Sequence, residues 1–175
     1  MNFLKNWFYP AKDKPEKKKV CWLLLGKILN ELLFLSEKET DQIADLDDTN
    51  PKVLQEIIRE FIVPNYHYYS RENQERIKDS LMYYLITDKE TLERIFPSHY
   101  VPIDSTSGEL FYTLVWKELY GTDYPGPINP SDYEEDCSAK YVNSLTQDSE
   151  LYKKFNPNDE RPSVANVIAR LKQNP

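Results

Sequence analysis

Glycine is scarce in this chain, with only four in 175 residues. Loops that bind nucleotide phosphates need several closely spaced glycines, because a backbone without Cβ atoms can approach the phosphates closely. The sequence has no such cluster, and it has no Gly-x-Ser-x-Gly turn to expose a catalytic serine. Neither a phosphate-binding loop of this kind nor hydrolysis at such a serine is expected.

Histidine is scarcer still, with His67 and His99 as the only two. A zinc site needs three or four ligands held together, and these histidines and the two cysteines have no ligand spacing. Carboxylates at calcium-loop spacing occur in Asp45–Glu56, but Asn50 replaces the glycine of the sharp turn. We therefore predict no metal site, no cofactor and no catalytic residue, and calcium binding by this loop stays open. An enzyme that used His67 or His99 is the less favoured alternative.

Long hydrophobic runs are also missing. The most apolar segment, Val20–Leu25, is followed directly by Gly26 and Lys27, which makes it too short for a secretory signal or a membrane span. Cys21 lies in this segment and is expected to be buried. Two distant cysteines in a chain that can bury a core favour a reducing compartment, although a disulfide between Cys21 and Cys137 stays open. We expect a cytoplasmic protein that does not bind membranes.

Apolar residues recur at spacings of three and four along most of the chain, which is typical of amphipathic helices. The first helix is predicted at about 16–35, and Pro64 is expected to end the helix that begins at Asn50-Pro51. Strand patterns are nearly absent, and His99–Asp104 is the one extended candidate. The predicted fold is an all-α, irregular bundle of about seven to eight helices with Pro-rich connecting loops. It forms a single domain over residues 1–175, with residues 1–15 as a basic and aromatic N-terminal arm.

Helix starts are marked by a Ser or Thr followed three residues later by Glu, the capping-box pattern in which each residue bonds the other's free backbone N–H. Four such pairs precede helical segments: Ser36–Glu39, Thr87–Glu90, Thr106–Glu109 and Ser131–Glu134. Their agreement with the apolar period supports the helical fold class.

Charge is divided along the chain. Residues 1–30 contain seven lysines and two acids, whereas residues 31–175 contain 15 basic and 27 acidic residues. An acidic surface attracts basic partners and repels nucleic acid and anionic membranes. The N-terminal lysines are expected to lie on a solvated helix face or to fold back onto the protein's own acids, so no nucleic-acid binding is predicted.

Tyrosines alternate with acids between Tyr120 and Tyr141, a pattern that suits a docking surface as well as a plain solvated face. The tyrosines of the segment 66–69 (YHYY) form either a second contact patch or a cover for helix ends. The candidate partner-binding residues are Tyr120, Asp123, Tyr124, Asp132, Tyr133, Glu134, Glu135, Asp136, Tyr141, Tyr66, His67 and Tyr68.

The sequence as a whole favours a non-enzymatic, acidic helical protein that binds a basic protein partner. Its most concrete form is an immunity or antitoxin-type inhibitor of a nuclease-like toxin. The alternative is a small helical adaptor or an oligomeric assembly subunit, and the oligomeric state is open. We identify no family, although residues 100–105 (YVPIDS) are similar, over a few residues, to the Tyr-Pro and acidic segment of small helical immunity proteins.

Overall fold

The computed structural model describes residues 16–96, 102–103, 106–156 and 162–173. It confirms the all-α fold class, because 69% of the chain is helical and the described residues contain only one two-stranded sheet. The predicted N-terminal arm and most of the extended candidate His99–Asp104 lie outside the described residues. In chain order the elements are β1 (Lys18–Val20), α1 (Trp22–Lys27), α2 (Asn30–Leu33), α3 (Glu37–Ala44), α4 (Pro51–Ile57), the π-helix η1 (Ile58–Ile62), α5 (Val63–His67), α6 (Arg71–Thr87), α7 (Lys89–Ile95), α8 (Gly108–Tyr120), the 3₁₀ turn η3 (Pro130–Asp132), β2 (Tyr133–Glu135), α9 (Ala139–Phe155) and α10 (Val164–Gln173).

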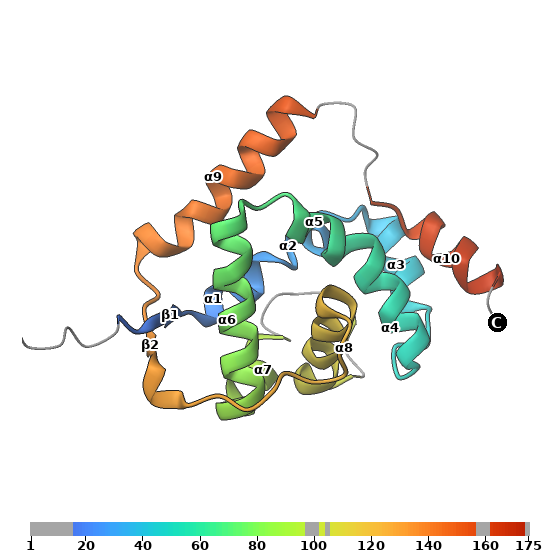
Figure 1. Cartoon of the computed structure of the whole chain (residues 1–175). Coiled ribbons are helices and arrows are strands. Elements are labelled where there is room, and N and C mark those ends of the chain that lie inside the picture. The colour runs from blue at the N-terminus through green and yellow to red at the C-terminus, as the bar shows by residue number, and fades with distance from the viewer. Residues whose placement is uncertain (1–15, 97–101, 104–105, 157–161, 174–175) are drawn as a thin grey trace, which may run out of the picture.

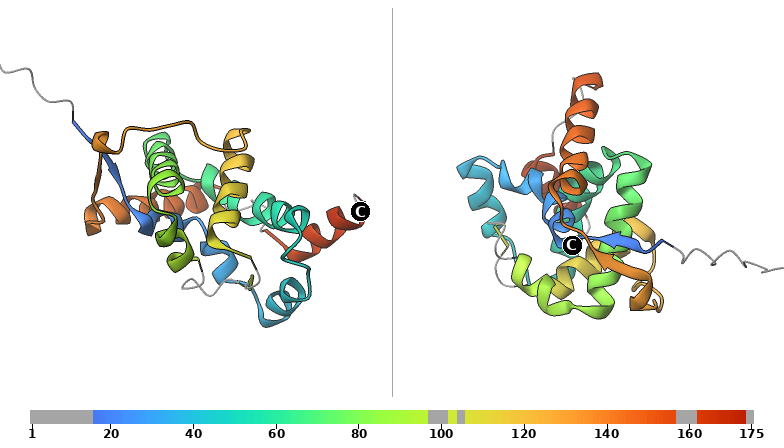
Figure 2. Two further views of the ribbon diagram at one scale, coloured as in Figure 1. Left: turned by 90° about the horizontal axis from the view of Figure 1, so that it is seen from below. Right: turned by 90° about the vertical axis from the view of Figure 1, so that its left-hand side faces the viewer.

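The long helix α6 organises one half of the molecule and α4 the other (Figures 1 and 2). Helix α6 packs against α1, α7, α8 and β1, while α4 packs against α8 and α10. Helices α9 and α10 lie at opposite sides of the molecule (Figure 1). Helix α8 contacts both halves and therefore joins them.

The buried side chains form one cluster that includes Cys21 near the start and Val167 near the end of the described chain. Aromatic rings fill its centre, where Phe96 and Phe111 lie 4.6 Å apart between ring centroids. The Tyr112 hydroxyl is buried with them and donates to the backbone oxygen of Leu25 at 3.3 Å. A buried tyrosine needs such a partner, so this bond ties α8 to α1.

Some predicted helix ends are confirmed. Ser36 and Glu39 form a complete capping box at the start of α3, and the Asn50 side chain accepts from Lys52 N at 3.0 Å at the start of α4. Ser70 accepts from the backbone of Asn73 and begins α6. Gly121 ends α8 with a φ of 71°, a conformation that costs glycine little.

The other three predicted capping boxes are wrong. Thr87 belongs to α6, and Asp88 caps α7 instead. Ser107 rather than Thr106 caps α8. Ser131 lies in η3, and the residues after it form strand β2. In each case a neighbouring polar side chain or a tertiary partner competes with the local pattern.

The sheet corrects the predicted first helix. Lys18 and Lys19 lie in β1, which pairs in parallel with β2 so that Lys19 is opposite Glu134. Directly after the sheet, Cys21 and Cys137 form a disulfide with their Cα atoms 5.1 Å apart. The sequence left this pairing open, and the bond removes the argument for a reducing compartment.

Pro64 does not end its helix. The chain continues from α4 through η1 into α5, and Val63 N donates to the carbonyl of Ile58, five residues earlier. Proline lacks an N–H, and its ring clashes with the preceding turn of an ordinary helix. The wide π turn lies directly before Pro64 and makes room for the ring, so the helical path survives.

Candidate functional site

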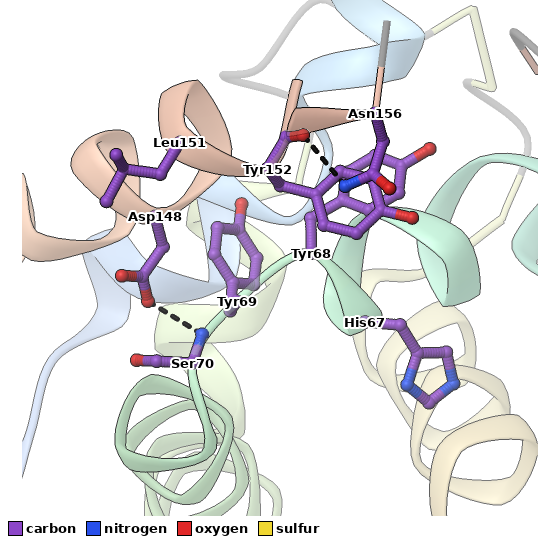
Figure 3. Close-up of a pocket in the computed structure, with 8 residues that line it drawn as sticks. All are labelled: His67, Tyr68, Tyr69, Ser70, Asp148, Leu151, Tyr152 and Asn156. Atoms are coloured by element: carbon purple, nitrogen blue, oxygen red, sulfur yellow. Dashed lines mark hydrogen bonds between the residues drawn. The ribbon is translucent and has the colours of Figure 1, made fainter. Parts of the chain in front are cut away.

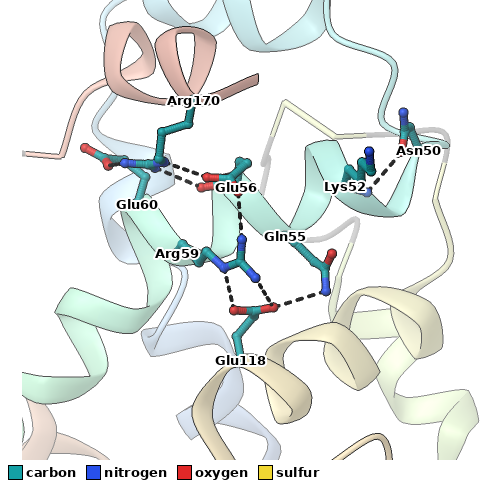
Figure 4. Close-up of polar contacts among 8 residues, drawn as sticks. All are labelled: Asn50, Lys52, Gln55, Glu56, Arg59, Glu60, Glu118 and Arg170. Carbon is teal, nitrogen blue, oxygen red and sulfur yellow. Dashed lines mark hydrogen bonds and ion pairs between the residues drawn. The ribbon is translucent and has the colours of Figure 1, made fainter. Parts of the chain in front are cut away.

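Charged side chains gather in two places on this fold. Between α4, η1, α8 and α10, two arginines hold three glutamates, and we call this group the arginine cluster (Figure 4). The other place is the surface around α6 and β2, which we call the α6–β2 face. Its residues are Tyr66, Glu75, Asp79, Tyr120, Tyr133, Glu134, Glu135, Asp136 and Tyr141. A pocket between α5 and α9 adjoins the N-terminal end of α6.

The arginine cluster is internally paired. Arg59 contacts Glu118 and Glu56, both at 2.7 Å, and Arg170 contacts Glu56 at 2.5 Å and Glu60 at 2.8 Å. Glu56 and Glu60 are only 9% and 8% exposed. Glu56 is the last residue of the candidate calcium loop, and it binds two arginines here (Figure 4). No group of His, Cys, Asp or Glu suited to hold a metal ion occurs among the residues that the structure describes.

Four of the predicted partner-binding tyrosines line the α6–β2 face. The Tyr120 hydroxyl donates to that of Tyr66 at 3.3 Å, and their rings meet edge to face. Tyr133 packs beside Tyr83 of α6, with ring centroids 5.5 Å apart. Tyr141 receives the Arg76 guanidinium over its ring at 4.6 Å. Segments far apart in the sequence therefore bring their tyrosines together along one helix.

These tyrosines are largely buried, so they are held in place by packing. Tyr66, Tyr133 and Tyr141 are 7%, 8% and 6% exposed. Burial is the main cause that raises the pKa of Tyr141 to about 12, and it raises the pKa of Tyr120 and Tyr133 as well. Glu75 and Asp79 of α6 raise the pKa of Tyr120 further. Tyr66, which the sequence predicts as part of a contact patch or as cover for helix ends, is thus mostly covered by its neighbours.

Lysines of β1 neutralise part of this face. Lys18 pairs with Asp79 at 2.7 Å, and Lys19 pairs with Asp136 at 2.9 Å. The hydrogen bond from Lys19 is the first cause that lowers the pKa of Asp136 to about 2. The expectation that N-terminal lysines fold back onto the protein's own acids is confirmed for Lys18 and Lys19.

The remaining predicted acids and tyrosines are spread more widely. Asp123 pairs with Lys117 at 2.6 Å beyond the end of α8, and the Tyr124 hydroxyl donates to Leu85 O. Asp132 accepts from Asn129 within η3. Glu134 and Glu135 of β2 are exposed. The residues of the stretch from 120 to 141 are thus held by contacts to several different elements.

The pocket has a volume of about 370 Å³ and is open to solvent (Figure 3). Two of the predicted residues, His67 and Tyr68, line it. The other lining residues are Tyr69, Ser70, Asp148, Leu151, Tyr152 and Asn156. The rings of Tyr68 and Tyr152 stack with centroids 4.2 Å apart, and Leu151 is 53% exposed.

Asp148 is the carboxylate of this pocket. Its Oδ2 accepts from Ser70 N at 2.7 Å and from Asn73 Nδ2 at 2.6 Å. Burial opposes the charged form, but these hydrogen bonds and the charge of Arg76 outweigh it and lower the pKa of Asp148. The group is therefore a fixed anion at neutral pH, placed by the first turn of α6.

Sequence reasoning missed the half of the pocket that α9 supplies. Asp148, Leu151 and Tyr152 follow the spacing i, i+3 and i+4, which places them on one helix face. That spacing was a usable signal, but nothing local showed that the face lies over the YHYY segment. Glu75 and Asp79 were missed for the same reason.

Of the two histidines considered for catalysis, the structure describes His67. His67 lines the pocket, but its imidazole points away from Asp148 (Figure 3). Its ring meets Tyr66 edge to face at 5.5 Å. His99 lies outside the described residues.

Within the described residues, no helix is both long and apolar enough to cross a membrane. The chain was compared with protein-family models, with curated proteins and with solved structures, and none of the three comparisons gave a match.

Proposed function

We propose that this protein binds a basic protein partner through the α6–β2 face and performs no catalysis itself. The observation that carries the proposal is the set of exposed carboxylates formed by Glu75 on α6 and by Glu134 and Glu135 on β2. All three are exposed, and within the described part of the chain none of them forms an ion pair. They lie beside ordered tyrosine rings, in a protein of net charge −7.

Such a face suits a basic partner for two physical reasons. Unpaired carboxylates raise the rate of encounter with a positively charged surface, and salt screens that effect. The packed tyrosine rings are largely buried and hold the surface around the carboxylates rigid, so this surface loses little conformational entropy on binding. The concrete form of the proposal is an immunity or antitoxin-type inhibitor, whose carboxylates occupy the positions of phosphates in the cleft of a nuclease-like toxin.

A cytoplasmic location stays a prediction, and its chemical basis is weaker than before. It depended on unpaired cysteines, whereas Cys21 and Cys137 are bonded in the structure. Disulfides persist mainly in oxidising compartments. Counting the free thiols of the denatured protein, after rapid alkylation in the native cell, decides between the two compartments.

The test is a charge reversal on the face. The variant Glu134→Lys/Glu135→Lys should bind the native basic partner at least about tenfold more weakly, mainly through a slower association rate. Surface plasmon resonance at low and high salt measures this rate. Asp41→Lys/Asp45→Lys, in α3 and at its C-terminal cap, changes two exposed acids by the same charge and serves as the matched control. Equal loss in both variants, or unchanged binding in the first, contradicts the proposal.

A further inference from the structure

The pocket between α5 and α9 combines an anion with aromatic walls. We propose that it binds the guanidinium group of an arginine side chain presented by the basic partner. This inference rests on the proposed function, and it adds a specific contact to the general attraction of the α6–β2 face.

The first argument is the state of Asp148. Both of its hydrogen bonds within the described residues end on Oδ2, so Oδ1 accepts none there. The backbone of Ser70 and the amide of Asn73 fix the carboxylate plane before any ligand arrives. A fixed, ionised carboxylate with an open oxygen is a strong acceptor for a charged N–H donor.

The second argument is the chemistry of the walls. Tyr68 and Tyr152 are stacked one helical turn beyond Asp148, and the Tyr69 ring is drawn between Asp148 and this stack (Figure 3). A guanidinium is planar and weakly hydrated, so it lies well against tyrosine rings while its N–H groups reach a carboxylate. A lysine ammonium is more strongly hydrated and has no plane to stack, so arginine fits this pocket better.

The third argument concerns the nearby cations, which are held elsewhere. Arg76 acts on Asp148 from α6, but it bonds Asn73 and Ser144 and pairs with Glu72. Lys153 of α9 pairs with Glu31 at 2.9 Å. Neither residue lines the pocket. Hydrogen bonds and the charge of Arg76 stabilise the ionised Asp148, and no lysine or arginine is among the residues that line the pocket, so a cation from a ligand would meet no lysine or arginine there.

Size sets the scale of the ligand. An open pocket of about 370 Å³ lies at the small end of ligand sites and admits one long side chain rather than a folded element. The exposed Leu151 at its rim offers apolar contact to the methylene groups of such a side chain.

The experiment is a two-dimensional ¹H–¹⁵N NMR titration of the full chain with N-acetyl-arginine methylamide. Saturable shifts are expected for backbone amides of residues 67–70 and 148–152. The matched citrulline compound has the same shape without the charge and should bind roughly tenfold more weakly. Absence of saturable shifts, or equal binding of citrulline, overturns the proposal.

Three substitutions on α9, one of them a control, locate the effect. Asp148→Asn keeps an oxygen for Ser70 N–H but loses the charge, and it should weaken arginine binding roughly tenfold. Glu150→Gln removes an exposed acid from the same helix and should leave binding unchanged. Tyr152→Leu tests the aromatic wall without touching the hydrogen bonds to α6, so weaker binding is expected here even if Asp148→Asn disturbs the fold.

The partner separates this inference from the proposed function. Glu134→Lys/Glu135→Lys should slow association with the partner, whereas Asp148→Asn should speed dissociation. If Asp148→Asn binds the partner normally and Glu134→Lys/Glu135→Lys does not, the α6–β2 face is supported and the arginine pocket is overturned. If both bind normally while free acetyl-arginine methylamide still binds the pocket, the pocket recognises a small cation and docking is overturned.

Discussion

The arginine cluster and the α6–β2 face contain the same kinds of charges and use them differently. Around Glu56 and Glu60, planar guanidinium groups pair with nearly buried carboxylates and join α4 to α10 (Figure 4). On the α6–β2 face, flexible lysines pair with partly buried acids, and the exposed Glu134 and Glu135 form no ion pair with the described residues. Acid count alone therefore does not identify a docking surface, because what matters is which acids the protein's own cations already hold.

The largest expected effect comes from removing the disulfide beside β2, which should destabilise the α6–β2 face more than the arginine cluster. Cys21→Ala/Cys137→Ala should lower the free energy of unfolding by about 4 kcal/mol, since the bond closes a sequence separation of 116. Urea unfolding at neutral pH measures the loss. Hydrogen exchange should accelerate in β1 and β2 more than in α4, and an equal acceleration would show that the two regions are not independent.

Removing one arginine tests the other region. Arg170→Met removes the ion pair of Glu60 and leaves Glu56 with Arg59 alone, and it should lower the free energy of unfolding by about 2–3 kcal/mol, below the range for fully buried pairs because Arg170 is 36% exposed. Lys172→Met, an exposed change on the same helix, is the control. Adding Glu60→Gln to Arg170→Met should restore part of the loss, and no recovery would mean that packing rather than charge holds α10.

The smallest expected effect is on the stability that the Lys19–Asp136 ion pair contributes, and this effect depends on pH. The pKa of Asp136 is about 2 in the folded protein, below its ordinary value of 3.8. Its stabilising contribution is therefore complete above about pH 4 and is lost as the pH falls toward 2. Urea unfolding of the wild type and of Asp136→Asn should differ at pH 7 and converge near pH 2. A difference that stays constant with pH would contradict a role for this charge.

Local sequence signals predicted most of the helices, because apolar spacing and caps such as Ser36, Asn50 and Ser70 act within one turn. They failed where a distant segment decides. Lys18 and Lys19 are helical by local pattern but extended by pairing with Tyr133 and Glu134. The structure gives the reason, because β1 lies against α6 and is bonded through the disulfide to the segment after β2.

The candidate sites were harder to predict than the fold. The sequence identified Tyr66, His67 and Tyr68 as a patch, but it did not show that Tyr66 joins Tyr120 while Tyr68 joins Tyr152 on another side. Adjacent residues on a helix end face different directions, and only the packing of α8 and α9 shows what each one meets.

The π-helix sets the angular phase of that segment. Its wide turn amounts to one extra residue in a helical path from Pro51 to His67, and each helical residue turns the chain by about 100°. Glu56 and Glu60, four residues apart, face α10, whereas Asn65 after the wide turn points inward and donates to Ile28 O at 3.0 Å. Deleting a single residue from 58–62 would rotate everything after it, and the tyrosines would lose their partners without one of them being mutated.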